Sequence, residues 1–226
     1  MKETRVNFST EWARTPAAAV VRETVISHIL GPAIDVYTHP RVSIDPGFGV
    51  LEPPVIFASN HSSHLDTPII LKSVPRRWRR KTAVVAAADY FYQNRAIASL
   101  VSLVFGTIPI ERARLSRDSL LLINGLIQKD WSLLFYPEGT RSRDGSMGRM
   151  RSGTGFLAVE YGLPVVPISL KGTYQAMPPG RFWPVHHPVT VRIAAPVTPM
   201  VGEEHRAFTA RLQGALDELA REPHPP

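Results

Sequence analysis

A histidine and an aspartate lie five positions apart, directly after a compact apolar run. His61 and Asp66 follow residues 55–58, whose composition is typical of a buried strand. The pKa of a histidine lies near neutrality, so His61 suits proton abstraction from an alcohol. A carboxylate on its other ring nitrogen would fix the tautomer and stabilise the imidazolium as it forms. The pair is therefore a candidate general base with its orienting group, although a histidine beside a helix-capping aspartate has the same spacing.

A second group of polar residues follows two further apolar runs and a glycine-containing turn. Arginine guanidinium groups suit phosphate oxygens, glycine permits a close backbone approach, and a threonine hydroxyl adds a donor. Together with the histidine and aspartate, these residues predict a base beside an anion-binding site. The candidate substrate-binding residues are Arg112, Glu138, Gly139, Thr140, Arg141 and Arg151.

Short apolar runs alternate with helical patterns along most of the chain. This alternation predicts an α/β fold, with a mixed, largely parallel sheet flanked by helices, and active residues in such folds gather at the carboxyl ends of strands. The expected strands are residues 55–58, 82–87, 107–110, 132–135, 165–170 and 189–193. The expected helices begin at residue 67 and cover residues 97–105, 116–127, 155–161 and 208–220.

We expect a single domain over residues 1–226, with a core at 55–196 and a C-terminal helix and loose tail at 197–226. Residues 1–50 form an N-terminal helical or interfacial segment. Its amphipathic helix begins after the capping Thr15 and ends at Gly31-Pro32, and a short strand is expected over residues 36–44. This helix either packs on the core or lies at a membrane interface. Because no apolar stretch reaches about 20 residues, a membrane would be met on its surface only.

The overall composition narrows the possible partners and excludes sulfur chemistry. The formal charge is +7, with 26 Lys and Arg against 19 Asp and Glu, which favours anionic partners such as lipid headgroups, phosphorylated substrates or nucleic acid. The chain has no cysteine, so a disulfide scaffold, a thiolate nucleophile and a sulfur-ligated zinc site are excluded.

In four blocks the chain resembles the glycerophospholipid acyltransferase family, whose best-known members are the 1-acylglycerol-3-phosphate acyltransferases. The family's Asn-His-x4-Asp block matches Asn60, His61 and Asp66, and its apolar Gly-to-Arg block matches residues 106–112. Its Pro-Glu-Gly-Thr-Arg-Ser block matches residues 137–142 without a gap, and its Val-Pro-Ile strand matches residues 166–168. The order and spacing of the blocks agree over roughly residues 55–174.

The resemblance implies direct acyl transfer from a thioester to lysophosphatidic acid, giving phosphatidic acid. His61, oriented by Asp66, would deprotonate the acceptor hydroxyl, with no covalent acyl-enzyme, no metal and no cofactor. The donor would be acyl-coenzyme A or acyl carrier protein, and the enzyme would be peripheral, on the cytoplasmic face of a membrane. By the same analogy Arg112, Glu138, Gly139 and Arg141 would hold the acceptor phosphate. Acylation of glycerol 3-phosphate or a glycolipid is the alternative within the family.

One departure from the family pattern affects the anion-binding site. Members often carry Phe-Lys-x-Gly after the third block, where this chain has Met-Arg-Ser-Gly over residues 150–153. Arg151 keeps the positive charge of the lysine but not its compact geometry. The preference for a headgroup therefore does not follow from the motif.

A basic segment is the candidate for contact with a membrane or with the phosphates of coenzyme A. Near an anionic surface each cation could contribute on the order of 1 kcal/mol, and tryptophan favours the interface. A solvated loop is the other interpretation. The segment consists of Arg76, Arg77, Trp78, Arg79, Arg80 and Lys81.

Two unrelated functions also fit parts of the sequence. His61, His64 and Asp66 resemble the ligand run of metal-dependent hydrolases, but the register differs by one and no histidine follows Asp66. The positive charge would suit a nucleic-acid-binding module, but aromatic and basic residues are not interleaved and no recognition motif occurs. We therefore expect neither a metal site nor a nucleic-acid partner.

Overall fold

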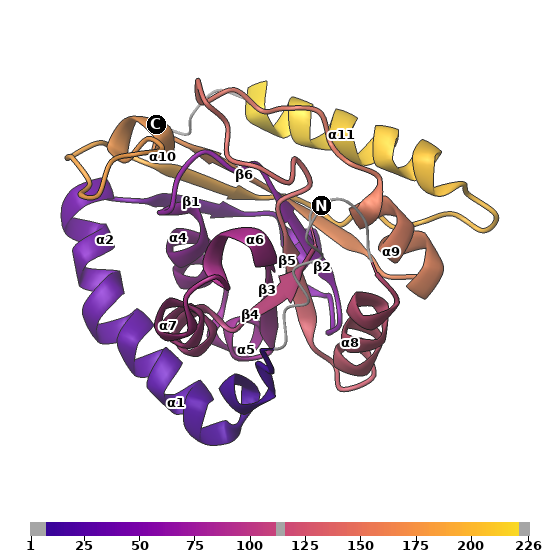
Figure 1. Cartoon of the computed structure of the whole chain (residues 1–226). Coiled ribbons are helices and arrows are strands. Elements are labelled where there is room, and N and C mark those ends of the chain that lie inside the picture. The colour runs from indigo at the N-terminus through magenta and orange to yellow at the C-terminus, as the bar shows by residue number, and fades with distance from the viewer. Residues whose placement is uncertain (1–7, 112–115, 222–226) are drawn as a thin grey trace.

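One mixed sheet with helices on both faces forms the framework of the protein (Figure 1). The computed structural model describes residues 8–111 and 116–221. In this part of the chain the strand order is β1-β7-β6-β2-β5-β3-β4. Only the β6–β7 pair is antiparallel, so the predicted fold class is confirmed. The strands are β1 (Arg41–Ile44), β2 (Ile56–Ser59), β3 (Thr82–Ala87), β4 (Thr107–Ile110), β5 (Ser132–Phe135), β6 (Val165–Lys171) and β7 (Thr190–Ile193).

The helices form one layer on each face of this sheet. Those of the N-terminal half, with α4 and α5, cover one face, and α8, α9 and α11 cover the other. The described helical segments are η1 (Glu11–Arg14), α1 (Pro16–Val25), η2 (Ile26–Leu30), α2 (Gly31–Thr38), α3 (Pro46–Gly49), α4 (Asp66–Ser73), α5 (Arg76–Arg80), α6 (Ala88–Phe91), α7 (Arg95–Phe105), α8 (Arg117–Ile127), α9 (Gly153–Tyr161), α10 (Thr173–Ala176) and α11 (His205–Arg221).

The central strand β2 shows how the apolar runs build the core. All four of its residues are buried, and successive side chains point to opposite faces of the sheet. Phe57 joins the apolar cluster beneath α4, while Ile56 and Ala58 join the cluster beneath α9 and α11. A continuous apolar run is therefore what a strand covered on both faces requires.

The direction of the strands brings the carboxyl ends of the parallel strands and the starts of β1 and β7 to one edge of the sheet. Because β2, β3, β4 and β5 are parallel, their carboxyl ends meet there. β7 runs the opposite way and β1 is parallel to β7, so the starts of β1 and β7 meet the ends of β2 and β6. In the register, Arg41 pairs with Thr190, and Thr190 pairs with Lys171.

The N-terminal helix is longer than the sequence predicted. It does begin after Thr15, whose hydroxyl accepts from the Ala18 N–H, but the prediction that it ends at Gly31-Pro32 is wrong. The turn η2 is a π-helix in which the Gly31 N–H donates to the Ile26 carbonyl. This wider turn lets the proline, which has no N–H, enter the first turn of α2 without breaking the helical path. The expected strand over residues 36–44 is correspondingly reduced to β1.

The resulting helical segment, Pro16–Thr38, spans 23 residues and reaches a mean hydropathy of 1.2. By length and composition it could therefore cross a membrane, contrary to our expectation that no segment of the chain is long enough. Helices that pack on soluble domains can have the same properties. Here the inward side chains of Ile26 and Ile34 are buried in the domain core.

The basic segment around Trp78 forms the short helix α5 rather than an exposed loop. Trp78 is 1% exposed and packs against Phe48 and Phe57, with ring centroids 5.1 and 5.8 Å apart. Its predicted contact with a membrane or coenzyme A is therefore wrong, because its ring fills the core. Arg79 is also largely buried and pairs with Glu23, at 3.0 Å from Nε to Oε2.

The remaining cations of this segment lie at the far side of the sheet from its carboxyl edge. Arg76 approaches Glu23 at 3.4 Å, Arg77 donates to the Gly49 carbonyl and Lys81 approaches Asp130 at 3.6 Å. The segment directly precedes β3, so it adjoins the amino ends of the parallel strands. It does not adjoin the edge where the other polar candidates lie.

A buried arginine joins the N-terminal helix to α7. Arg22 is 2% exposed, and its guanidinium donates to the carbonyls of Ala13, Ser102 and Leu103. Burial, with a smaller contribution from nearby Arg14, lowers the pKa of Arg22 to about 10, so the group remains charged at neutral pH. It serves as a C-terminal cap for α7, where helix carbonyls lack partners within the helix.

Arg22→Met should lower the free energy of unfolding by about 2–4 kcal/mol, because methionine fills part of the space but donates no hydrogen bond to these carbonyls. Urea unfolding followed by circular dichroism measures the loss. Arg206→Met, on the exposed surface of α11, should change stability by less than about 0.5 kcal/mol. Equal effects of the two substitutions would show that the buried contacts of Arg22 contribute nothing specific.

Candidate active site

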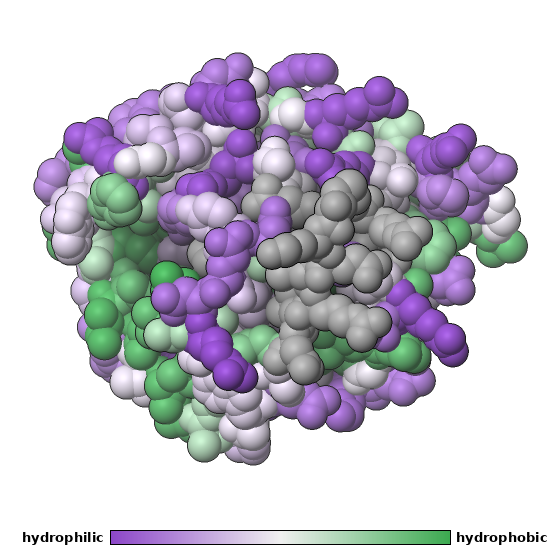
Figure 2. Space-filling view, viewed as in Figure 1, coloured by the Kyte–Doolittle hydropathy of each residue, from purple (hydrophilic) through white to green (hydrophobic). Residues whose placement is uncertain are grey.

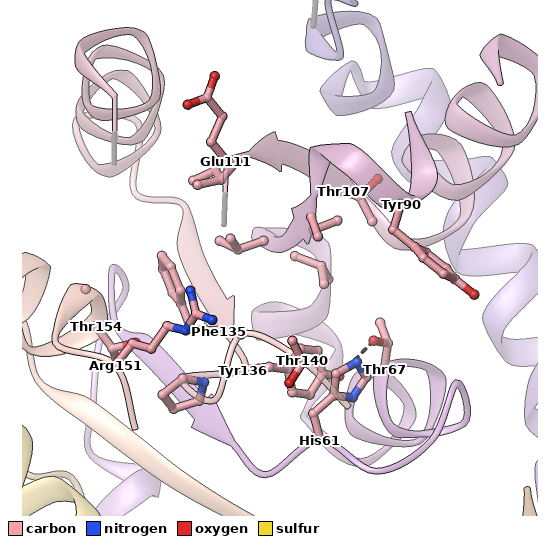
Figure 3. Close-up of a pocket in the computed structure, with 18 of the residues that line it drawn as sticks. His61, Thr67, Tyr90, Thr107, Glu111, Phe135, Tyr136, Thr140, Arg151 and Thr154 are labelled. Carbon is pink, nitrogen blue, oxygen red and sulfur yellow. Dashed lines mark hydrogen bonds between the residues drawn. The ribbon is translucent and has the colours of Figure 1, made fainter. Parts of the chain in front are cut away.

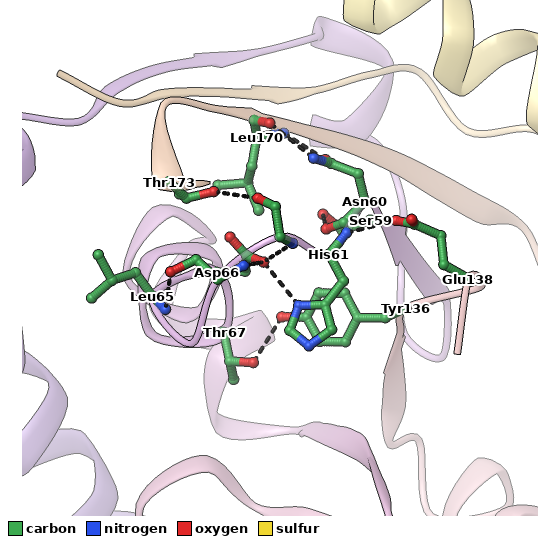
Figure 4. Close-up of polar contacts among 12 residues, drawn as sticks. Ser59, Asn60, His61, Leu65, Asp66, Thr67, Tyr136, Glu138, Leu170 and Thr173 are labelled. Atoms are coloured by element: carbon green, nitrogen blue, oxygen red, sulfur yellow. Dashed lines mark hydrogen bonds and ion pairs between the residues drawn. The ribbon is translucent and has the colours of Figure 1, made fainter. Parts of the chain in front are cut away.

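His61 and Asp66 meet in the turn that connects β2 to α4 (Figure 4). His61 Nδ1 lies 2.8 Å from Asp66 Oδ2. Asp66 is fully buried, whereas the His61 side chain is 20% exposed. A carboxylate at Nδ1 favours the tautomer that carries its proton there, which leaves the Nε2 lone pair free to accept one. The predicted pair thus has the geometry of a general base and its orienting group.

The same aspartate oxygen also holds the turn itself. Asp66 Oδ2 accepts the backbone N–H groups of Ser62 at 2.7 Å and Ser63 at 2.8 Å. Asp66 is the first residue of α4, where a negative charge is favoured by the helix dipole. One buried carboxylate therefore fixes both the backbone of the turn and the plane of the imidazole.

A tyrosine that was not among the predicted site residues packs against one face of the His61 imidazole. The rings of His61 and Tyr136 are stacked, with centroids 3.9 Å apart and planes 19° from parallel. The Tyr136 hydroxyl is 2.7 Å from the Thr67 hydroxyl. Burial beside Asp66 raises the pKa of Tyr136 well above its ordinary value, so the phenol stays neutral. Its position at the end of β5, one residue before the Pro-Glu-Gly motif, is the signal that could have identified it.

Neighbouring segments hold the backbone on either side of His61. Asn60 forms paired hydrogen bonds with the backbone of Leu170 in β6, at 2.9 and 2.8 Å. The His61 carbonyl accepts from the Ser142 N–H at 2.7 Å. The asparagine of the first motif is thus a link to the adjacent strand.

Glu138 organises the turn instead of binding phosphate. Its two carboxylate oxygens accept the N–H groups of His61 and Gly148, both at 2.8 Å. Burial raises its pKa, and these two hydrogen bonds oppose the rise. Glu138 does not line the adjoining cavity, and a carboxylate would repel an anion. We therefore replace its predicted role in phosphate binding with a positioning role.

The dyad opens into a cavity of about 690 Å³ at the carboxyl edge of the sheet, which we call the main cavity (Figure 3). This volume is typical of small-molecule sites. The wall combines apolar side chains with a polar group around His61. The apolar residues include Val84, Val85, Val101, Phe105, Ile110, Leu120, Phe135 and Phe156. The polar residues include Thr67, Tyr90, Thr140, Arg141 and Arg151.

Arg141 faces the main cavity within a small polar cluster. Its guanidinium lies 5.2 Å from the centre of the Tyr90 ring, and Nη2 donates to the Tyr90 hydroxyl at 3.1 Å. That hydroxyl is also 3.3 Å from His64 Nε2. Among the described residues, Arg141 Nη1 is buried without a hydrogen-bond partner. The arginine therefore retains donor capacity for an anion, and its role in binding one stays a prediction.

The other predicted anion-binding residues divide into two groups. Gly139, Thr140 and Arg151 line the main cavity. Gly139 has a φ of +75°, and a Cβ atom there would lie 2.9 Å from Arg151 Nε, so glycine is needed for the arginine to lie across the turn. Arg112 lies outside the described residues. Tyr90 and His64 were not predicted, although both occur in segments that leave strands at this edge.

The metal-site alternative finds no matching cluster in the described part of the chain. No three His, Asp or Glu side chains there are grouped to hold an ion. His64 instead contacts Tyr90.

His64 should make the stability of the protein depend on pH. Burial lowers the pKa of His64 from 6.5 to about 4; the nearby Arg141 and His61 act in the same direction and Asp66 in the opposite one. Between pH 6.5 and 4 the unfolded chain therefore binds a proton at this residue that the folded chain does not. The contribution of neutral His64 to the free energy of unfolding is therefore complete above pH 6.5 and is lost as the pH falls from 6.5 to 4.

Urea unfolding of wild type and His64→Gln at several pH values measures this dependence. The difference in the free energy of unfolding between wild type and His64→Gln should decrease as the pH falls from 7 to 4. The matched control is His28→Gln, which changes an exposed histidine of the N-terminal helix. A constant difference between wild type and His64→Gln across the window would contradict the proposed protonation behaviour.

Comparisons with known proteins identify relatives of similar sequence. The chain is 32% identical over 137 residues to the chloroplastic 1-acyl-sn-glycerol-3-phosphate acyltransferase BAT2 of Brassica napus, covering 59% of this chain and 38% of that protein. It is 30% identical over 164 residues to the chloroplastic 1-acyl-sn-glycerol-3-phosphate acyltransferase LPAT1 of Arabidopsis thaliana, covering 70% and 44%. The chain thus spans less than half the length of these two relatives.

A solved structure shows a similar fold. It is the 1-acyl-sn-glycerophosphate acyltransferase PlsC of Thermotoga maritima, with a TM-score of 0.67 and 21% sequence identity, covering 94% of this chain and 82% of that chain. The sequence model of the family described as Acyltransferase matches residues 34–171, which include the dyad and both arginines of the main cavity. The chain therefore belongs to the acyltransferase family.

Proposed function

We propose that this protein transfers a fatty acyl group from a thioester to the hydroxyl of lysophosphatidic acid, giving phosphatidic acid. The observation that carries the proposal is the dyad itself. His61 bonds to buried Asp66 through Nδ1 and lines an apolar cavity that also contains two arginines. The names of the relatives in Brassica napus and Arabidopsis thaliana support the same reaction.

His61 acts as the general base in the proposed mechanism. Nε2 accepts the proton of the acceptor hydroxyl while the hydroxyl oxygen attacks the thioester carbonyl, and Asp66 stabilises the imidazolium that forms. The tetrahedral intermediate then collapses with cleavage of the carbon–sulfur bond. The leaving thiolate takes the proton from the imidazolium, so the ester and a free thiol are formed and His61 returns to its starting state.

The two cavity arginines supply the site for the acceptor phosphate. In lysophosphatidic acid only a few bonds separate the phosphate from the hydroxyl that reacts. The phosphate must therefore lie close to His61 when that hydroxyl reaches Nε2. Arg141 and Arg151 line the cavity that contains His61, and charge-assisted hydrogen bonds from arginine are strong. The apolar part of the cavity accommodates an acyl chain, and the acyl donor is a substrate, so no cofactor is required.

The outward face of the N-terminal helix is the proposed contact with a membrane. Its exposed side chains include Val20, Val21, Ile29 and Val36, and Figure 2 shows green side chains along the side where Figure 1 places α1 and α2. A lipid acceptor and a lipid product make a membrane surface the natural place of reaction. We propose a peripheral enzyme, because the apolar outward face suits a bilayer interface, and we place it on the cytoplasmic face as the family resemblance implies.

His61→Ala should lower kcat by about 10²–10⁴-fold, because it removes the proton acceptor. Asp66→Asn should also lower kcat strongly, since the amide cannot favour the required tautomer or stabilise the imidazolium. The assay follows thiol release from palmitoyl-coenzyme A with lysophosphatidic acid as acceptor. Arg206→Ala, on the exposed surface of α11, is the control and should retain full activity.

Thiol release that depends on the acceptor and is lost in His61→Ala would support both the reaction and its base. Release unaffected by His61→Ala would overturn the mechanism. Release with glycerol 3-phosphate, but none with lysophosphatidic acid, would overturn the proposed acceptor while retaining the chemistry.

Tyr136 should act as a positioning residue for the base. Tyr136→Leu removes the stacked ring and should lower kcat about 3- to 10-fold, from the typical energy of an aromatic pair. Tyr136→Phe keeps the ring but loses the contact with Thr67, so its activity should lie closer to wild type. The pH dependence of kcat/KM should change in Tyr136→Leu and be restored in Tyr136→Phe. Parallel pH profiles in all three proteins would show that Tyr136 only fills space.

A further inference from the structure

A second cavity lies at the same edge of the sheet, on the other side of the catalytic turn. Its volume is about 430 Å³, which lies within the range of ligand sites. Its wall includes two cations and two aromatic side chains. It also includes two small residues, and these two belong to the loops around the dyad. These residues are Arg41, Lys171, Tyr174, His187, Ser62 and Gly145.

The reversal of β7 assembles this second cavity. Arg41 begins β1 and Lys171 ends β6, and both are in register with Thr190 of β7. Cross-strand neighbours point to the same face of a sheet. With a strand spacing of about 4.8 Å, the Cα atoms of Arg41 and Lys171 lie roughly 10 Å apart. The fold therefore presents two cations side by side, at a separation that suits a ligand with more than one anionic group.

The positive charge in the second cavity has no acidic counterpart. None of its described lining residues is Asp or Glu. Within the part of the chain that the structure describes, neither Arg41 nor Lys171 forms an ion pair. His187 and Gln175 add further polar groups to the wall. An anion would therefore find donors here without repulsion from a neighbouring carboxylate.

Close backbone contacts connect the second cavity to the catalytic turn. The Ser62 hydroxyl, one residue after His61, lies 3.0 Å from the Thr173 hydroxyl. Gly172 has a φ of +93°, and a Cβ there would lie 2.2 Å from the Pro188 carbonyl oxygen. Glycine thus allows the segment that carries His187 to approach the end of β6. The His61–Ser62 backbone separates the two cavities, with His61 lining one and Ser62 lining the other.

We propose that the second cavity binds the phosphorylated nucleotide end of an acyl-coenzyme A donor. This inference rests on the proposed acyl transfer. The acyl chain then occupies the main cavity, the thioester lies beside His61, and the pantetheine arm crosses the catalytic turn. Arg41 and Lys171 bind the phosphates, while Tyr174 and His187 flank the nucleotide.

The separation of the two cavities favours the donor over the acceptor as the source of these phosphates. An acceptor phosphate lies only a few bonds from the reacting hydroxyl and so belongs in the main cavity, near Arg141 and Arg151. The phosphates of coenzyme A are separated from the thioester by the long pantetheine arm. They can therefore bind on the far side of the turn. The basic helix α5 lies at the opposite edge of the sheet, and its Trp78 is buried.

The first test is calorimetric binding of adenosine 3′,5′-bisphosphate, which requires no catalysis. Wild type should bind this nucleotide, and Arg41→Ala/Lys171→Ala should bind it at least about tenfold more weakly, because two charge-assisted contacts are lost. The control is Arg206→Ala/Arg221→Ala, which removes the same charge from exposed positions of α11 and should bind like wild type. Thr190→Glu adds a carboxylate to the second cavity without removing a cation and should also weaken binding at least about tenfold.

The second test is steady-state kinetics of the same variants, after thermal unfolding has shown that they are folded. The KM for palmitoyl-coenzyme A should rise at least about tenfold in Arg41→Ala/Lys171→Ala, with little change in kcat or in the KM for lysophosphatidic acid. A rise in the KM for lysophosphatidic acid instead would assign the second cavity to the acceptor and overturn the proposal.

The two tests separate this inference from the proposed function. Nucleotide binding that depends on Arg41 and Lys171 supports the site even if lysophosphatidic acid is not acylated. No binding of the nucleotide to wild type overturns the inference, even if acyl transfer occurs. Nucleotide binding that persists unchanged in the Thr190→Glu variant would also overturn it.

Discussion

The buried carboxylate oxygen Asp66 Oδ2 is the point on which the site depends. It accepts hydrogen bonds from the His61 ring and from the backbone N–H groups of Ser62 and Ser63. A buried charge of this kind is stable only when it is well hydrogen-bonded. The three donors that stabilise it are supplied by the turn that it shapes. The geometry of the turn and the orientation of the imidazole therefore depend on the same carboxylate oxygen.

The sheet places this turn between two different environments. Parallel strands β3, β4 and β5 lead into the apolar main cavity. On the other side of the turn, the reversed strand β7 brings Arg41 of β1 beside Lys171 at the end of β6. Sites at a change of strand order or direction are common in α/β folds, because loops diverge there and leave space. Here the divergence leaves a cavity on either side of the turn that carries His61, one largely apolar and the other lined by Arg41 and Lys171.

The sequence was sufficient to predict the parts of the fold that depend on local patterns. The apolar runs marked the central strands, and the spacing of His61 and Asp66 identified the dyad. The failures arose where tertiary contacts decide. The basic neighbours of Trp78 suggested that it contacts a membrane or coenzyme A, but its ring is buried against Phe48 and Phe57. A π-turn carries the N-terminal helix past Gly31, and Glu138 bonds to amides that lie far from it in the sequence.

The N-terminal helix is held to the domain by buried polar contacts as well as by apolar packing. Peeling it away would strip Arg22 of its carbonyl acceptors and separate Glu23 from Arg79. Both changes would break charge-assisted hydrogen bonds that hold the helix to the folded domain. This helix and the sheet must therefore tilt together on any lipid surface. In the proposed membrane-bound state, the angle of the domain and the height of the main cavity above the headgroups would then be set by the rigid body and not by a hinge.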